Sequence, residues 1–441
     1  MKKLMMLLCL SCFSSIAFAS GSTTPADADA ASDTEIKLEG CFDFQSGYRN
    51  QKKLSGTSKN ITDNKKNLGF YTESAFMATV KQELNDVTAG AKIVLLPTTK
   101  PKLSAAYNGS HIFLATGYGK VELGSPDGAA SKIGVGTGST AVPLGGCGWS
   151  KFAVLDDDNM KYKGLKPDFD TSGSSTSHMD SFSNSFDDIS SKTEASRKVS
   201  YYTPEMQGFQ FGISYIPDSA NTGGNRSLKN LDDNGLSKLG VGVTKVKVPD
   251  INGGKDNQVI INQNVRDAIS AGISYKYEII DDVSVKVGIT GEYGKPASKI
   301  IVLDPDDKVL SRHKLSNLAA YNLGAIFTYG NISCAASYGN LGKSLTSKAY
   351  HKVGRNTQYY KGAIAYGQGP MKTSVSYFRS LRYKNTVDTI SLGTQYLVTP
   401  GLLPYAEISY FQAKGKPVYF VEAPKTKTRG TVALIGARLK F

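Results

Sequence analysis

Apolar and polar residues alternate along most of this chain from Glu35 onward. In the first such segment the apolar side chains share one face of an extended chain and the polar side chains share the other: Ile36, Leu38, Phe42 and Phe44 against Lys37, Glu39, Asp43 and Gln45. A period of two predicts a half-buried β-strand. The same pattern predicts sixteen strands, near residues 36–48, 68–82, 87–97, 108–116, 119–125, 196–204, 208–217, 265–278, 282–294, 317–330, 332–340, 355–367, 370–381, 386–399, 402–413 and 429–441.

The connections between these strands alternate in length. Those after even-numbered strands are tight turns, whereas those after odd-numbered strands are mostly long: 49–67, 98–107, 126–195, 218–264, 295–316, 341–354 and 414–428. Short connections at one end and long ones at the other are typical of a transmembrane barrel with periplasmic turns and external loops. An even number of strands also lets the first and last strands pair antiparallel and close the sheet.

The fold class predicted is therefore all-β, a transmembrane antiparallel β-barrel of sixteen strands. Weak alternation around Leu239, Val241 and Val243, and again at Val259–Ile261, leaves eighteen strands open as an alternative. The final segment alternates through Ile435, Ala437 and Leu439 and ends on Phe441, which we interpret as a barrel closure and assembly signal.

The first residues have the features of an export signal. Two lysines precede an apolar core, and Ala17-Phe18-Ala19 matches a cleavage site, so residues 1–19 are predicted to be a signal peptide. Residues 20–34 are small and acidic and predict a flexible leader, and residues 35–441 a single barrel. Cleavage would lower the formal charge from +14 to +12 and leave Cys41, Cys147 and Cys334, an odd number. No essential disulfide is expected, and we leave open whether any of the three pair.

Several segments resemble one known family. KLEGCFDFQSGYRNQ (37–51), GKVELGSPDGAASK (119–132), KVSYYTPEMQGFQFGISYIPD (198–218) and TPGLLPYAEISYF (399–411) are similar to the Gram-negative general-diffusion porins. The resemblance covers most of the mature chain and includes Phe441. It implies a sixteen-stranded barrel in the outer membrane, a homotrimer, and a third external loop, here near 126–195, that folds inward to narrow the pore.

In such a barrel the polar positions of the strands face the lumen. They include a basic set predicted to line the pore wall: Lys37, Lys92, Lys120, Lys198, Lys276, Lys286, Lys361, Lys372 and Arg438. Charges in a narrow aqueous passage select among solutes. The alternative is that inward polar residues only keep the lumen wet and pair with nearby acids such as Glu39, Glu122 and Glu407.

The predicted third loop differs in charge from that wall. Between Gly124 and Ala195 there are ten acidic and six basic residues. The acids predicted to face the lysines across a constriction, and so to favour small hydrophilic solutes and ions, are Asp127, Asp156, Asp157, Asp158, Asp168 and Asp170. An exposed, solvated loop tip is an equally weighted alternative for the run 156–158, and a calcium site is a weaker one because the ligand spacing of an EF-hand is absent.

Catalytic chemistry is not predicted. The four histidines form no metal-binding spacing, no G-x-S-x-G motif occurs, and the glycine-rich segment 134–140 lacks a Walker lysine. We therefore expect no catalytic, cofactor-binding or metal-binding residues, and we interpret Cys147 and Trp149 as loop packing. The lysines are dispersed rather than clustered, which argues against nucleic acid, so the expected partners are the lipid bilayer, lipopolysaccharide, and small hydrophilic solutes and ions. A substrate-specific channel, and an adhesin or surface antigen with a closed lumen, remain alternatives.

Overall fold

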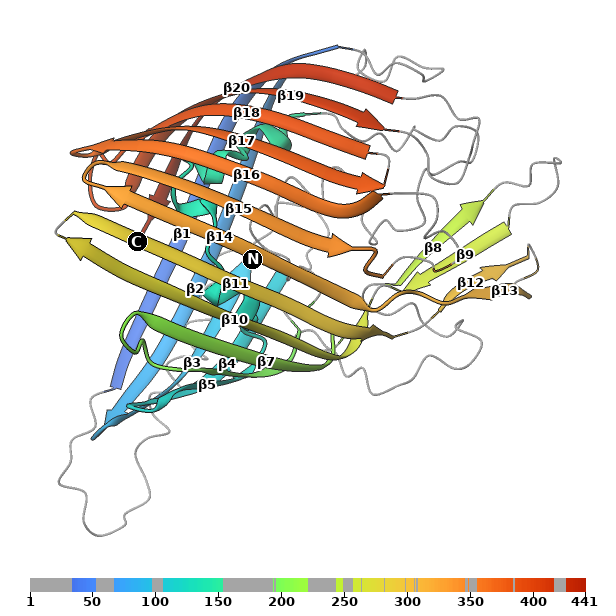
Figure 1. The fold of residues 1–441 in the computed structure, drawn as a ribbon, viewed down its shortest axis with the longest axis horizontal. Coiled ribbons are helices and arrows are strands. Elements are labelled where there is room, and N and C mark those ends of the chain that lie inside the picture. The colour runs from blue at the N-terminus through green and yellow to red at the C-terminus, as the bar shows by residue number, and fades with distance from the viewer. Residues whose placement is uncertain are drawn as a thin grey trace, which may run out of the picture.

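The chain forms a closed antiparallel β-barrel of sixteen strands (Figure 1). The structure is a computed structural model, and it describes residues 34–52, 67–96, 106–153, 193, 196–220, 243–248, 257–262, 264–280, 282–297, 299–304, 306, 308–345, 348, 355–383, 385–415 and 426–441. The predicted signal peptide and most of the predicted leader lie outside these residues. In barrel order the strands are β1 (Thr34–Gln51), β2 (Leu68–Leu84), β3 (Val87–Leu96), β4 (Ala106–Thr116), β5 (Gly119–Gly124), β6 (Lys198–Tyr202), β7 (Phe209–Asp218), β10 (Val265–Ile280), β11 (Val283–Pro296), β14 (Leu318–Tyr329), β15 (Ile332–Gly342), β16 (Arg355–Gln368), β17 (Met371–Tyr383), β18 (Asn385–Tyr396), β19 (Leu402–Gly415) and β20 (Thr426–Lys440).

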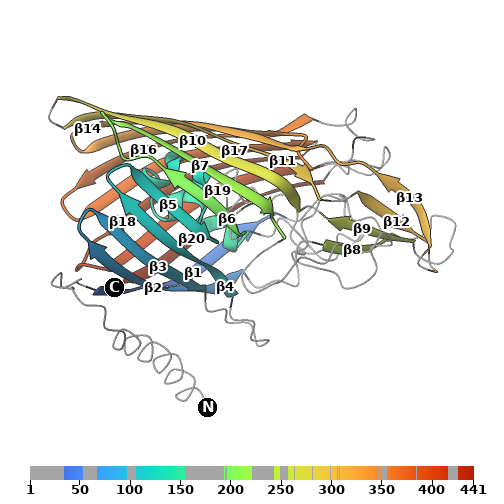
Figure 2. The same ribbon diagram turned by 90° about the horizontal axis from the view of Figure 1, so that it is seen from below.

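The prediction of sixteen strands is confirmed, and the alternative of eighteen is wrong. Strands do form in the doubtful region, as β8 (Val243–Val248) and β9 (Asn257–Asn262), but they lie outside the barrel. With β12 (Ile300–Leu303) and β13 (Val309–His313) they make a separate four-stranded sheet in the order β13-β12-β9-β8 (Figure 2). Six residues rise about 20 Å and, tilted by about 45°, are too short to cross a band about 25 Å tall.

The external sheet also corrects the prediction for residues 295–316. That segment was expected to be a connection without strands, whereas it contains β12 and β13. Both strands are short, and β12 is a run of apolar residues without alternation, so the pattern of period two could not identify them.

The two faces of the barrel differ in chemistry. Most outward side chains are large, apolar and exposed; the exposed fraction is 56% for Ile36 and 51% for Phe42. Asp43, next to Phe42, points inward and is only 4% exposed. The usual order of a soluble protein is therefore inverted, as required where the outer face contacts hydrocarbon. No helix in the described part of the chain is long and apolar enough to cross a membrane.

The barrel closes where β1 pairs with β20 along eleven residue pairs, from Cys41↔Lys440 to Gln51↔Gly430. One step further Gly40 and Phe441 exchange two backbone hydrogen bonds, of 2.8 and 3.1 Å. The Phe441 ring stacks on Phe42 with centroids 6.1 Å apart. The last residue of the sequence is thus part of the seam that closes the sheet.

Candidate functional site

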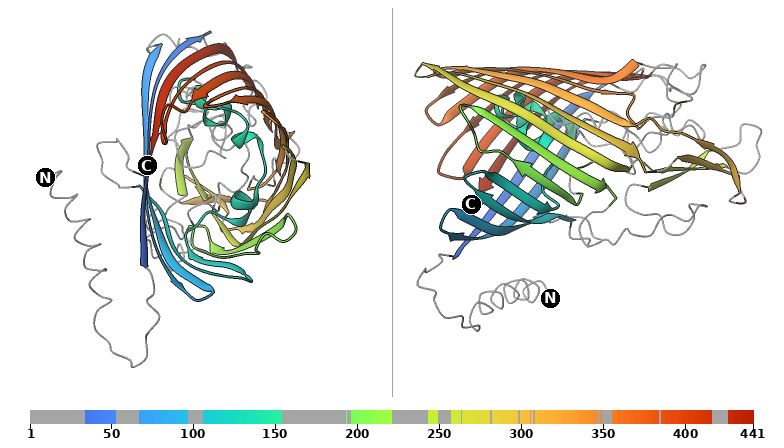
Figure 3. Two further views of the ribbon diagram at one scale, coloured as in Figure 1. Left: turned by 90° about the vertical axis from the view of Figure 1, so that its left-hand side faces the viewer. Right: turned by 60° about the horizontal axis from the view of Figure 1, so that its bottom comes forward.

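Residues 125–153, which follow β5, enter the barrel and lie along its inner wall (Figure 3, left). It contains α2 (Ala129–Ile133) and three short 3₁₀ turns, η2 (Thr137–Ser139), η3 (Leu144–Gly146) and η4 (Gly148–Lys151). In order, these elements contact β6, β7, β10 and β11, then β14–β16, then β18, and finally β19 and β20. We call residues 125–153 the inner arc.

Close approach of the inner arc to the wall depends on wall glycines. A Cβ atom at Gly324 of β14 would overlap the carbonyl oxygen of Val135, and one at Gly393 of β18 would overlap that of Val142. Both obstacles are backbone atoms, so neither overlap would be relieved by a side-chain rotation. The arc can therefore lie flat on the wall only because these two positions carry no side chain.

Wall serines bind the backbone of the inner arc. The amides of Ala129 and Ala130 donate to the Oγ atoms of Ser214 and Ser270, each at 2.9 Å. The amide of Val142 donates to Ser374 Oγ at 2.8 Å. These buried bonds satisfy arc amides that no regular secondary structure pairs, which removes the cost of burying them unpaired.

Three of the predicted pore-wall lysines also hold the arc. Lys198 and Lys361 lie on the inner wall but are only 3% and 4% exposed. Lys361 Nζ donates to the carbonyl of Gly145 at 2.6 Å, and Lys198 Nζ donates to those of Pro126 and Ser196 at 2.5 and 2.8 Å. Lys372 acts similarly and donates to the carbonyl of Ser139 at 2.8 Å. Lys198 and Lys361 are thus covered by the protein rather than presented to the lumen.

The end of the arc is anchored by an acid and two aromatic rings. Glu407, 3% exposed, accepts hydrogen bonds from the amides of Gly148 and Trp149 at 3.3 and 3.0 Å. The Trp149 ring is fully buried and stacks on Phe411, with centroids 5.2 Å apart and planes 18° apart. Beyond this anchor, Phe152 packs against the wall at Gly47.

Replacing Lys361 by methionine tests the lysine anchors. The aliphatic stem is retained, but the buried carbonyl of Gly145 loses a charged donor, so we expect a loss of about 1–3 kcal/mol of folding stability. The measurement is the urea midpoint of the refolded barrel in detergent. Lys286→Met, on an exposed lysine of the inner face, is the matched control and should shift the midpoint little; equal shifts would contradict the anchoring role.

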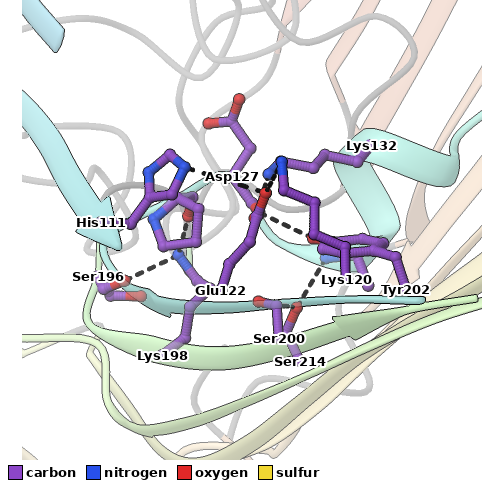
Figure 4. Close-up of polar contacts among 12 residues, drawn as sticks. His111, Lys120, Glu122, Asp127, Lys132, Ser196, Lys198, Ser200, Tyr202 and Ser214 are labelled. Atoms are coloured by element: carbon purple, nitrogen blue, oxygen red, sulfur yellow. Dashed lines mark hydrogen bonds and ion pairs between the residues drawn. The ribbon is translucent and has the colours of Figure 1, made fainter. Parts of the chain in front are cut away.

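A basic cluster occupies the inner wall near the root of the arc (Figure 4). The buried carboxylate of Glu122 forms ion pairs with Lys120, at 3.0 Å, and with Lys132 of the arc. His111 lies 3.9 Å from the same carboxylate. Lys92 is in register with His111 on the neighbouring strand. We name Lys92, Lys120 and Lys132 the wall cluster; Glu122 is the carboxylate at its centre, and Glu39 also lies within electrostatic range of Lys92.

The other predicted wall residues lie in three places. Lys37 pairs with Glu39 at 2.8 Å, and it lies level with Lys92 of the wall cluster, with Thr79 of β2 between them. Arg438 pairs with Asp43 at 2.7 Å, beside the seam. Lys276 and Lys286 are directly opposite each other on β10 and β11, near a tight turn, and Lys276 also pairs with Glu278 at 2.7 Å. The predicted wall is thus divided among several sites rather than gathered into one ring.

Of the predicted constriction acids, only Asp127 lies among the described residues. Its side chain is exposed, and its carbonyl accepts a hydrogen bond from the Tyr202 hydroxyl at 3.3 Å. Asp156, Asp157, Asp158, Asp168 and Asp170 lie outside the described residues. The inner arc itself carries one acid and two lysines, so the acidic character of the whole connection comes from residues after 153.

Sequence reasoning did not identify the contacts that hold the arc. Glu407 was interpreted as a partner for wall lysines, whereas it binds backbone amides, and Lys132 was not singled out. Trp149 is packed against the wall, as its interpretation as loop packing predicted. The sequence did contain one signal for the wall contacts of the arc. It was the presence of serine or glycine at inward positions of strands that otherwise carry bulky or charged residues.

A sequence profile described as Gram-negative porin matches residues 8–416. Uncharacterized proteins of Rickettsia felis and Rickettsia conorii are each 56% identical, over 445 and 444 residues, and each match covers 100% of both chains. The solved structure of an anion-selective porin from Comamonas acidovorans has a TM-score of 0.51 at 13% identity and covers 93% of this chain and 100% of its own. That likeness shows the fold.

Proposed function

Because this chain belongs to the Gram-negative porin family, we propose that its barrel is a water-filled channel through which small hydrophilic solutes and ions diffuse passively across the outer membrane. Sixteen strands enclose an interior wide enough for an aqueous channel. Charged side chains such as Asp43, Lys120 and Glu122 lie on the inner face, while large apolar side chains cover most of the outer face, which is the arrangement that such a channel needs.

The observation that carries the proposal is how the inner arc is held. Its backbone is bound to the wall by serines, buried lysines and a buried glutamate, so that the arc follows the wall instead of crossing the lumen as a plug (Figure 3, left). We infer that the arc narrows the channel by a fixed amount and that permeation needs no large movement of it.

The wall cluster supports a weak preference for anions. Lys120 remains 41% exposed and Lys132 30% exposed despite their pairing with Glu122. Within a Debye length of about 8 Å at physiological salt, their summed field acts on any ion that passes. Asp127, and the acids after residue 153 if they approach the lumen, would oppose this field, so we propose a modest preference rather than exclusion of cations.

Conductance in planar bilayers tests both parts of the proposal. The full-length mature protein should give stable single-channel steps, and its reversal potential in a tenfold KCl gradient should favour chloride. Replacing Lys92, Lys120 and Lys132 together by glutamine should lower the chloride-to-potassium permeability ratio several-fold, because the carboxylate of Glu122 then dominates locally. Lys295→Gln, which removes an exposed cation paired with Asp267 on β10, should leave the ratio unchanged.

Solute uptake separates the proposal from its alternatives. Swelling rates of vesicles containing the protein should fall smoothly with solute size and rise linearly with solute concentration. Saturation with one solute would instead indicate a substrate-specific channel. An absence of conductance would favour a surface antigen or adhesin with a closed lumen, and the external sheet of β8, β9, β12 and β13 would then be the first part to test for binding.

The targeting that the sequence predicts and the assembly that the porin resemblance implies fit the same proposal. We propose that the chain is exported by a cleaved signal peptide of residues 1–19 and assembles as a homotrimer. Mass measurement of the outer-membrane protein, intact and after dissociation, tests both statements, with a mature start at Ser20 expected.

A further inference from the structure

A thiol of the inner arc lies beside an ammonium group of the barrel wall. Lys361 Nζ is 3.7 Å from Cys147 Sγ, although the two residues are 214 positions apart in the sequence. The lysine belongs to β16, and the cysteine lies between η3 and η4 of the arc. Both side chains also donate to one carbonyl oxygen, that of Gly145, at 2.6 Å from Nζ and 3.3 Å from Sγ. The arc and the wall therefore meet at a thiol–amine pair held by a shared acceptor.

Two glycines give the arc the turn that precedes this thiol. Gly145 and Gly146 have φ angles of +67° and +70°, a region that glycine adopts without the steric cost that other residues incur. A Cβ atom at Gly146 would also overlap Ser376 Oγ of the wall. The backbone thus fixes where Cys147, the next residue, approaches Lys361.

The surroundings of Cys147 favour oxidation of its sulfur. The side chain is partly exposed, so a small solute in the lumen can contact it. A neighbouring ammonium stabilises the thiolate, which is the form of cysteine that reacts with peroxides. Cys334 is also partly exposed, but its neighbours in register are Phe327 and Ile364. Apolar neighbours give a thiolate no such stabilisation, so the two thiols should differ in reactivity.

We propose that a hydroperoxide oxidises Cys147 and that the oxidised sulfur then bonds to Lys361, so that a covalent sulfenamide joins the arc to β16. In the first step the Cys147 thiolate attacks a peroxide oxygen and the O–O bond breaks. The leaving hydroxide takes a proton from the Lys361 ammonium, which gives a sulfenic acid, a neutral amine and water.

In the second step the Lys361 nitrogen attacks Sγ. The S–N bond forms, the S–O bond breaks, and the hydroxide leaves as a second water with a proton from that nitrogen. Sulfenic acids condense with nitrogen nucleophiles in this way. The sulfur loses two electrons in all, and the peroxide gains them.

The link would make the attachment of the arc depend on the redox state. In the reduced protein Lys361 holds the arc through a hydrogen bond to Gly145, whereas in the oxidised protein a covalent bond would hold it at Cys147. Thiols reduce an S–N bond of this kind and would restore the first state. The inference rests on the proposed channel in one respect, because the peroxide, a small hydrophilic solute, has to reach Cys147 through the lumen.

Peptide mapping by mass spectrometry tests the link. The full-length mature protein is oxidised in detergent with a small excess of hydrogen peroxide, then unfolded and digested with trypsin in the absence of thiols. A linked pair of peptides containing Cys147 and Lys361 should appear, lighter than the sum of the two by two hydrogen atoms. Cleavage after Lys361 should fall several-fold and return after dithiothreitol. Cleavage after Lys372, which holds the arc through the carbonyl of Ser139, is the matched control and should not change.

Two variants separate the thiol from the amine. In Cys147→Ser, peroxide should leave cleavage after Lys361 complete. Lys361→Arg retains a cation beside the thiol, but the guanidinium stays protonated and does not form the link. Cys147 should then stop at the sulfenic acid, which dimedone captures. In the wild type, Cys334 should form no link to any lysine.

Two results would overturn the proposal. One is equal cleavage after Lys361 in oxidised wild type and oxidised Cys147→Ser. The other is failure of methyl methanethiosulfonate, a small thiol reagent, to label Cys147 in the folded, reduced protein, because a peroxide would then not reach it either. Neither readout measures ion flow. Labelling without the link, in a protein that conducts, would refute the link alone, whereas a linked protein without conductance would refute the channel alone.

Discussion

Replacing Trp149 by alanine is expected to release the end of the inner arc from the barrel wall. Trp149 is fully buried and stacks on Phe411, and its amide is one of the two that donate hydrogen bonds to Glu407. Truncating a buried tryptophan costs about 3–5 kcal/mol. At 1.4 kcal/mol for each factor of ten, protection of the amides of Gly148 and Trp149 against hydrogen exchange should fall by at least about a hundredfold.

The same substitution should alter the channel current. An arc that detaches and returns will change the free cross-section of the lumen, so single-channel recordings should show larger current fluctuations than the wild type. Trp149→Phe is the control, because it retains a ring against Phe411 and should preserve most of the protection. A quiet channel with unchanged exchange in W149A would show that the wall serines and lysines alone hold the arc.

The barrel was predictable because a strand that separates water from lipid must alternate. Each spanning segment needs one apolar face and one polar face, and that constraint is written locally in every strand, as in Ile36 to Gln45. The alternation of long and short connections then set the direction of each strand. The external sheet had no such constraint, since β12 and β9 pair with each other in water and through residues far apart in the sequence.

The candidate site was less predictable because it depends on backbone contacts. Lys361 and Lys120 both occupy inward positions of alternating strands, yet one is 4% exposed beneath the arc and the other is 41% exposed beside Glu122. What distinguishes the two lysines is whether the arc passes over them. The path of the arc depends on wall positions such as Gly324, where a Cβ atom would overlap the arc backbone. A single sequence shows which residues point inward but not which of them another segment covers.

Substitution of Gly40 by valine is expected to weaken closure of the barrel, and to do so through Phe441. A Cβ at Gly40 would overlap the ring of Phe441, and that ring stacks on Phe42. The ring is the end of a side chain and can rotate away, at the cost of the stack and of packing across the seam. We expect a loss of about 1–3 kcal/mol, the usual range for overpacking, measured as a lower urea midpoint and a smaller fraction of heat-modifiable barrel on electrophoresis.

A double-mutant cycle identifies the ring as the cause. In a Phe441→Ala background the obstacle is absent, so G40V should add little to the loss that F441A produces alone, and the coupling between the two should be about as large as the effect of G40V itself. Gly362→Val on β16 is the control, since the nearest atom to a Cβ there is 4.0 Å away. Additive effects of G40V and F441A would mean that valine disturbs the β1–β20 pairing directly. In that case the role of Phe441 in closure would rest on its two backbone hydrogen bonds to Gly40, which any residue at that position except proline can form in full.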